Sequence, residues 1–240
     1  LGVPDSAGVT SGAVQDTICL DYNDKESVKR VFSEYKSDIA GVILEPITGN
    51  MGVIRPTASF LEAIQQGCRE TGALLIFDEV MCGFRVHTNG AQGLLGITPD
   101  LTMLGKVIGG GLPCGAYGGR AAIMDQLAPQ GGVYQAGTLS GNPVVMAAGI
   151  ATLSQLQQND IITQVATATQ VFCESLQDQV KTYGISITQV GSMFSLFFSE
   201  KTPQSLADVM NSDIRRFNQF YHGLLENGIY FPPSAYEACF

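Results

Sequence analysis

Apolar runs and helical apolar spacing alternate along the first part of the chain. Residues 39–46, with the sequence IAGVILEP, form an apolar run that ends at a proline, which is typical of a strand buried on both faces. Between Thr57 and Gly72 the apolar residues recur at helical spacing instead. A second apolar run, ALLIFDEV at 73–80, follows directly. This order of strand, helix and strand predicts an α/β fold with a mainly parallel sheet and flanking helices.

The middle of the chain continues this layer. The segments DLTMLGK at 100–106 and GAYGGR at 115–120 are expected to add strands to the sheet. An Asn-Pro pair at 142–143 begins a predicted helix that has no charged residue before Asp160.

The last part of the chain has a different pattern. Helical spacing continues as far as Val180, and two strand-like runs follow at 185–190 and 193–198. A helical segment is then expected from 205 to 226. We therefore predict that residues 1–155 belong to a large domain and residues 156–240 to a smaller, incomplete α+β domain.

Composition narrows the classes of function. The chain has 240 residues, of which 45% are apolar and 15% are charged, as expected for a well-packed globule. Its net charge of −9 and its isoelectric point near 4.6 argue against nucleic acid or an anionic membrane as a partner. No apolar run reaches the roughly 18 residues of a membrane span. The chain opens at Leu1 rather than at a methionine, and both ends have the character of loops, so we expect a fragment.

The cysteines and histidines indicate no metal site. Six cysteines are scattered without CxxC spacing: Cys19, Cys68, Cys82, Cys114, Cys173 and Cys239. Their mostly apolar surroundings favour reduced thiols in a cytosol-like compartment over disulfides or zinc ligands. The only two histidines, His87 and His222, lie far apart in the sequence.

Two ionisable residues stand at the ends of predicted strands. Asp78 follows the apolar residues 73–77, and α/β sheets bind ligands at the carboxyl ends of their strands. Its alternative role, which Glu79 could share, is to cap the loop that follows. Lys106 is the only charged residue in the segment 101–119, so we expect its amine to be buried and unprotonated. A carboxylate and a lysine on successive strands suit pyridoxal phosphate, whose aldehyde reacts with an amine and whose ring nitrogen needs an anion.

Glycine-rich segments follow the lysine. The glycines at 109–111 allow close approach of a ligand or of another chain, although a tight turn is the more common role of such a run. In YQAGTLSGNP at 134–143, Gly137, Thr138 and Ser140 offer N–H and hydroxyl donors before a predicted helix, which suits an anion. An ordinary helix cap would have the same sequence features.

Taken together, three segments resemble the class III aminotransferases, which are pyridoxal-phosphate enzymes of fold type I. They are FDEVMCGFR at 77–85, TPDLTMLGKVIGGGLPCGAYGGR at 98–120 and YQAGTLSGNP at 134–143. The resemblance extends along the whole chain and is greatest to the glutamate-1-semialdehyde aminomutases of this family. It covers only part of a family member, because an N-terminal part with a phosphate-binding cup and a ring-stacking aromatic residue has no counterpart here.

The resemblance implies a cofactor role for five residues. Lys106 would bond to the aldehyde of pyridoxal phosphate, and Asp78 would pair with the ring nitrogen. Val80 would pack on one face of the ring. Gly137 and Thr138 would bind the phosphate across the interface of a homodimer.

Two further residues would contact the cofactor or the substrate. Asn50, in TGNMG, stands where many relatives have a glutamate that gates a substrate-binding arginine, and an asparagine there is typical of the aminomutases. Glu237 matches a carboxylate near the substrate amine, although it could equally be a surface residue. Cys82 and the turn 87–89 depart from the usual residues of relatives near the cofactor.

The implied reaction is the isomerisation of glutamate 1-semialdehyde to 5-aminolevulinate in tetrapyrrole biosynthesis, with pyridoxal or pyridoxamine phosphate as cofactor. Lys106 would move the proton between cofactor and substrate carbons. A class III ω-aminotransferase that uses another amino donor is one alternative, and a truncated, non-catalytic relative is another. The resemblance implies a location in the bacterial cytoplasm or the plastid stroma.

Overall fold

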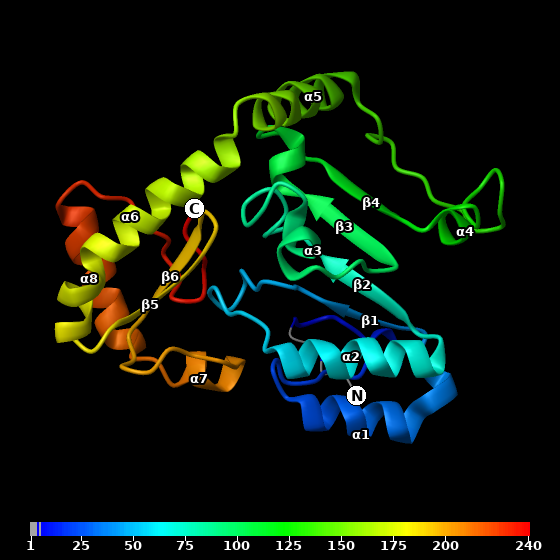
Figure 1. The fold of residues 1–240 in the computed structure, drawn as a ribbon, viewed down its shortest axis with the longest axis horizontal. Helices are drawn as coiled ribbons and strands as arrows, with labels where there is room; N and C mark the ends of the chain where they lie inside the picture. The colour runs from blue at the N-terminus through cyan, green and yellow to red at the C-terminus, as the bar shows by residue number, and fades with distance from the viewer. Residues whose placement is uncertain (1–3, 5) are drawn as a thin grey trace.

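The computed structural model describes residue 4 and residues 6–240, and Figure 1 shows a larger and a smaller sheet. The larger sheet has the strand order β1–β2–β3–β4, with bounds Gly41–Leu44, Leu74–Asp78, Leu101–Gly105 and Gly115–Gly119. The first three strands are parallel, and β4 runs antiparallel to β3. The predicted α/β fold with a mainly parallel sheet is confirmed.

Helices α1 (Lys25–Tyr35) and α2 (Ala58–Thr71) cover one face of this sheet. The hydroxyl of Thr57 accepts the backbone N–H of Phe60 and so caps the start of α2. The buried sides of both helices meet the β2 side chain of Phe77 in one core. The remaining elements of this part are short: η1 (Ser11–Ala13), η2 (Lys36–Asp38), α3 (Gly90–Leu95), η3 (Lys106–Gly109) and α4 (Ala121–Met124).

The opposite face of the sheet is open in the described part of the chain. Strand register places Ile43, Ile76, Met103 and Tyr117 on this face. Ile43 is 57% exposed and Tyr117 is 44% exposed. The expectation that the first apolar run is buried on both faces was therefore wrong for β1, because helices cover only one side of it.

The second part of the chain surrounds a two-stranded sheet. Helices α5 (Pro143–Gln158) and α6 (Ile161–Thr182) lead to the antiparallel hairpin of β5 (Ser186–Val190) and β6 (Met193–Phe197). Figure 1 shows α6 lying along this hairpin. The segment expected as one helix from 205 to 226 is two helices, α7 (Leu206–Met210) and α8 (Ile214–Glu226). Within residues 4 and 6–240, no helix has the length and apolar character that a membrane crossing requires.

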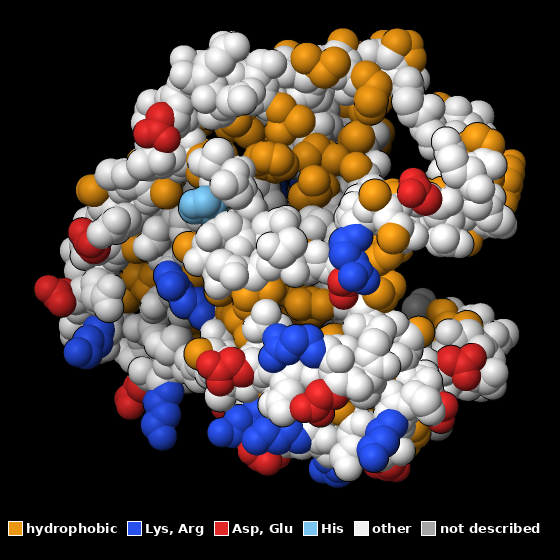
Figure 2. Space-filling view, turned by 45° about the vertical axis from the view of Figure 1, so that its right-hand side comes forward, with side chains coloured by type: hydrophobic (Ala, Val, Ile, Leu, Met, Phe, Trp, Pro, Cys, Tyr) orange, Lys and Arg blue, Asp and Glu red, His pale blue; other side chains and the backbone are white. Residues whose placement is uncertain are grey.

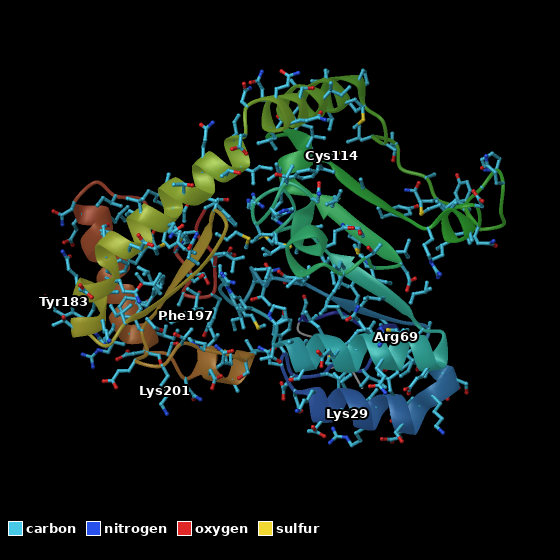
Figure 3. All side chains as sticks on the ribbon, in the orientation of Figure 1. Lys29, Arg69, Cys114, Tyr183, Phe197 and Lys201 are labelled. Atoms are coloured by element: carbon cyan, nitrogen blue, oxygen red, sulfur yellow. The ribbon has the colours of Figure 1, made fainter. Side chains whose placement is uncertain are left out.

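The two parts share buried contacts at the ends of the larger sheet. The ring of Phe197, labelled in Figure 3, packs with Ile54 in a small core that includes Val209. The backbone N–H of Gly52 donates to the carbonyl of Tyr236 at 2.7 Å. The loop after β1 is thus fixed against the C-terminal residues. The domain division at 155 stays a prediction.

Candidate active site

Three neighbouring parallel strands each end at an ionisable residue. Glu45 follows β1, Asp78 ends β2, and Lys106 follows β3. Leu44 is in register with Phe77, so Glu45 comes next to Asp78 at the same edge of the sheet. This edge is where an α/β sheet forms its ligand site, and it holds both of the catalytic residues predicted from the sequence.

The carboxylate of Asp78 has one oxygen that bonds its own loop. Its Oδ1 accepts the backbone N–H of Val80 at 3.0 Å, and no partner of Oδ2 is found among the residues that the structure describes. Strand alternation turns Asp78 away from the buried side chain of Phe77, towards the open face. The carboxylate is therefore able to accept a further donor.

Glu79, rather than Asp78, holds the following loop. Its side chain is 1% exposed and accepts the backbone N–H of Ala91 at 2.5 Å. It also accepts the backbone and side-chain N–H groups of Gln92, each at 3.1 Å. These bonds fix the start of α3, so the capping role that the sequence left open belongs to Glu79.

Lys106 is exposed, which corrects the expectation that its amine is buried. The residue has φ of +46° at the start of η3, directly after β3. The apolar residues beside it in sequence turn elsewhere: Ile108, for example, is buried. A chargeless sequence around a lysine therefore did not imply a buried lysine.

Val80 follows Asp78 by two residues and lies close to the end of β3. A Cβ on Gly105, the residue before Lys106, would lie 3.1 Å from a methyl group of Val80. This contact places Val80 beside the end of β3, as a residue that packs on a bound ring would have to be placed. Its contact with a ring stays a prediction.

The glycine run after Lys106 serves packing. A Cβ on Gly110 would lie 2.7 Å from the carbonyl oxygen of Ala148 in α5. A Cβ on Gly149 would lie 2.5 Å from the carbonyl oxygen of Ile108. The glycines thus allow η3 and α5 to approach closely. Cys114, labelled in Figure 3, lies in this region beneath α5.

The predicted phosphate residues, Gly137 and Thr138, lie apart from the strand ends. Both are exposed, in a long link that runs from α4 to α5 in Figure 1. The cap of α5 is Asn142, whose side chain accepts the N–H groups of Val144 and Val145. Within the described residues no hydrogen bond joins Gly137 or Thr138 to Asp78 or Lys106.

Asn50 and Glu237 lie on two loops that contact each other. Gly52, two residues after Asn50, donates to the carbonyl of Tyr236, the residue before Glu237. Both predicted side chains are exposed. Asn50 donates through Nδ2 to Oε1 of Glu45 at 2.9 Å. The structure therefore joins the two loops that carry the residues predicted to contact substrate.

Glu45 is the site residue that the sequence reasoning missed. It is the first ionisable residue after an apolar strand, which is the feature that pointed to Asp78. Pro46, directly after it, marks the end of this strand in the sequence and so places Glu45 at the edge of the sheet. The hydroxyl of Tyr22 donates to the carbonyl of Glu45 at 3.0 Å, and burial raises the pKa of this phenol, so it remains a donor.

Cys82 is fully buried beside the loop carboxylate. Its sulfur lies 3.9 Å from Oε2 of Glu79. Burial, together with the charge of Glu79, raises the pKa of the Cys82 thiol, so it acts as a neutral, weak donor. All six cysteines are free thiols. In the described part of the chain no group of His, Cys, Asp and Glu side chains could hold a metal ion.

Comparisons with known proteins identify the family of this chain. The profile of the class-III aminotransferases matches residues 3–239. A β-phenylalanine aminotransferase from Variovorax paradoxus is 32% identical, with a TM-score of 0.86 over 92% of this chain and 51% of that chain. An ω-transaminase from Sphaerobacter thermophilus is 27% identical, with a TM-score of 0.88 over 99% of this chain and 55% of that chain.

An aminomutase shares the fold at lower identity. The glutamate-1-semialdehyde aminomutase from Pseudomonas aeruginosa, in complex with PMP, is 22% identical, with a TM-score of 0.78 over 97% of this chain and 54% of that chain. Other solved relatives hold PLP. The chain thus spans about half the length of these solved proteins. From the match over nearly all of its residues, the chain belongs to the class-III aminotransferase family.

Proposed function

We propose that this chain supplies the lysine and the ring-nitrogen partner of a pyridoxal-phosphate enzyme that moves an amino group. The observation that carries the proposal is the shared strand edge. There, Lys106 follows β3 and an incompletely bonded Asp78 ends β2. In the described chain Lys106 has no carboxylate within ion-pair distance, so no ion pair has to be broken before its amine bonds to a cofactor.

The residues present fit this cofactor. Oδ2 of Asp78, which has no partner among the described residues, can accept a hydrogen bond from the protonated ring nitrogen, and Val80 offers an apolar surface beside the end of β3. Pyridoxal phosphate supplies an aldehyde that exchanges amino groups and a ring that withdraws electrons from the substrate carbon. The carboxylate of Asp78 would stabilise the positive charge of the protonated ring nitrogen. The amine of Lys106 would move the proton to and from the substrate carbon.

The specific reaction we propose is the isomerisation of glutamate 1-semialdehyde to 5-aminolevulinate. Asn50 supports it through the resemblance: many relatives have a glutamate here that gates a substrate-binding arginine, whereas an asparagine is typical of the aminomutases. The competing function is that of an aminotransferase with a separate amino donor. It is supported by the higher identity to the β-phenylalanine aminotransferase, at 32%, than to the aminomutase, at 22%.

We also propose that two copies of the chain complete each other's sites. Gly137 and Thr138 would then hold the phosphate in the partner's site, since in the described residues no hydrogen bond joins them to Asp78 or Lys106. Leu139, Val144 and Ile150 are each at least 66% exposed around this link and α5. Figure 2 shows hydrophobic side chains gathered over the part of the molecule where α5 lies. Such a surface suits a two-fold interface.

The test uses the full-length parent protein and two substitutions. Lys106→Ala should abolish turnover while pyridoxal phosphate still binds weakly, and borohydride reduction of the unaltered protein should label Lys106 in a peptide map. Asp78→Asn should retain that label but lose at least about 100-fold in kcat, because a neutral amide no longer holds the ring proton. The matched control, Lys181→Ala on α6, should leave the borohydride label on Lys106 and kcat unchanged.

The assay also separates the two reactions. Conversion of glutamate 1-semialdehyde without an added amino donor supports the isomerase. A strict requirement for a second amino donor identifies the aminotransferase instead. A borohydride label on Lys181 or Lys201, or near-normal activity of Asp78→Asn, would overturn the site assignment.

A further inference from the structure

The carboxylate of Glu45 makes two hydrogen bonds, both within the loop that follows β1. Its Oε2 accepts the backbone N–H of Gly49 at 2.8 Å. Its Oε1 accepts the side-chain Nδ2 of Asn50 at 2.9 Å. One carboxylate therefore fixes both the turn of the loop and the side chain at its tip.

The bond to Glu45 decides which way the Asn50 amide faces. A carboxylate only accepts hydrogen bonds, so the NH2 end of the amide must face it and the carbonyl oxygen Oδ1 must face away. Asn50 is exposed, and Oδ1 has no donor among the described residues. The side chain thus presents a hydrogen-bond acceptor outward from the strand edge.

The support behind this pair is rigid. Between Glu45 and Asn50 the loop is buried, with Ile47 at 1% and Thr48 at 2% exposed. The hydroxyl of Thr48 accepts the N–H of Ile54 at 2.9 Å and donates to the carbonyl of Gly52 at 2.6 Å. The loop is therefore held on both sides of Asn50.

We propose that Glu45 is a positioning residue of the cofactor and substrate site, which orients Asn50 so that Oδ1 accepts from a hydroxyl or ammonium group of the bound molecule. The register of β1 and β2 places Glu45 beside Asp78, so the acceptor belongs to the same edge as Lys106. This inference rests on the proposed function for the identity of the bound molecule. The effect of Glu45 on Asn50 itself depends only on the two hydrogen bonds.

The test replaces the carboxylate by an amide in the full-length parent protein. In Glu45→Gln one of the two carboxylate oxygens becomes an NH2 group. This NH2 group, a donor, then faces another donor, either the backbone N–H of Gly49 or the side-chain NH2 of Asn50. We expect either a lost loop bond or a reversed Asn50 amide, and a loss of about 10- to 100-fold in affinity for pyridoxal phosphate or in kcat/KM. The dissociation constant of the cofactor is measured directly on the apoprotein by equilibrium dialysis.

The chain offers a matched control and an internal one. On α2 the amide of Gln66 donates to the carboxylate of Glu70 at 2.7 Å. Glu70→Gln replaces the carboxylate of this amide–carboxylate pair on another surface. It should change neither the affinity for pyridoxal phosphate nor kcat/KM. Asn50→Ala should show the same loss as Glu45→Gln. The double variant should lose no more than either single variant, because Glu45 acts through Asn50.

The outcomes decide both the proposal and the donor. A larger dissociation constant of the cofactor would identify a cofactor hydroxyl as the group that donates to Asn50. A raised KM of the substrate with unchanged cofactor binding would identify a substrate ammonium instead. Additive losses in the double variant, or an effect of Glu45→Gln no larger than that of Glu70→Gln, would overturn the proposal. If Glu45→Gln does not fold, a normal cofactor affinity and KM in Asn50→Ala overturns it. Failure of the proposed function would show separately, because borohydride reduction would then leave Lys106 unlabelled.

Discussion

Replacing Gly52 by alanine should destabilise the contact between the loop after β1 and the smaller sheet. Gly52 has φ of +76°, and its N–H donates to Tyr236. A Cβ there would lie 2.5 Å from two carbons of the Phe197 ring, which is 1% exposed. Two separate costs follow, one from the backbone and one from the buried ring.

The two costs can be separated by a second glycine. A left-handed conformation costs an alanine roughly 1–2 kcal/mol, and overpacking of a buried ring adds roughly 1–3 kcal/mol. Gly72 has φ of +79° but no atom within 4 Å of its Cβ position, so Gly72→Ala should cost only the first amount. We therefore expect Gly52→Ala to lose roughly 2–5 kcal/mol of unfolding free energy.

The measurement is urea denaturation of the unaltered protein and the two variants at equal protein concentration. Gly52→Ala should have the lower midpoint, and the further change Phe197→Leu should recover part of the loss by making room for the new methyl group. Equal midpoints for Gly52→Ala and Gly72→Ala would refute the reasoning, because they would show that Phe197 does not restrict this position.

Three further predictions address the loop carboxylate, the thiols and the assembly. Glu79→Ala should cost about 3 kcal/mol of unfolding free energy, because it leaves buried N–H donors unpaired; thermal unfolding measures it, and a loss under about 1 kcal/mol would contradict it. The exposed thiol of Cys19 should react with iodoacetamide at pH 8 at least about 100-fold faster than Cys68, whose pKa burial raises to about 11. Between pH 9, the pKa of a free thiol, and pH 11 the folded protein keeps the Cys68 proton that the unfolded chain loses. The stability due to this proton is therefore complete below pH 9 and is lost as the pH rises towards 11; a flat stability profile over this range would contradict it. Mixing inactive Lys106→Ala and Thr138→Asp subunits should restore activity, and no recovery after verified subunit exchange would place Thr138 in the site of its own chain.

The periodic parts of the fold were predictable from the sequence. The apolar spacing between Thr57 and Gly72 gave α2 its buried face, because helices on a sheet must bury one stripe. The two-helix end of the chain was not predictable at this level. Asp213 accepts the N–H of Arg216 and begins a new helix inside a segment whose apolar pattern continues.

The candidate site was predictable as a set of strand ends but not as a set of contacts. Asp78 follows an apolar run, and a polar residue there lies at a sheet edge whatever the rest of the chain does. The exposure of Lys106 and the bond between Glu45 and Asn50 depend on tertiary packing. Neither feature leaves a periodic pattern of apolar residues in the sequence, so neither could be predicted from the sequence.

Asp78 and Glu79 show how two adjacent carboxylates acquire different roles. Successive residues at a strand end point to opposite sides, so one of the pair faces the packed side and the other faces the open side. Glu79 is buried and bonded to the loop of α3, and this satisfied group would be costly to move. Asp78 lies towards the open face with an oxygen to spare, beside the strand that leads to Lys106. Under the proposed function, the chemistry at this edge would therefore take place on the open side of the sheet.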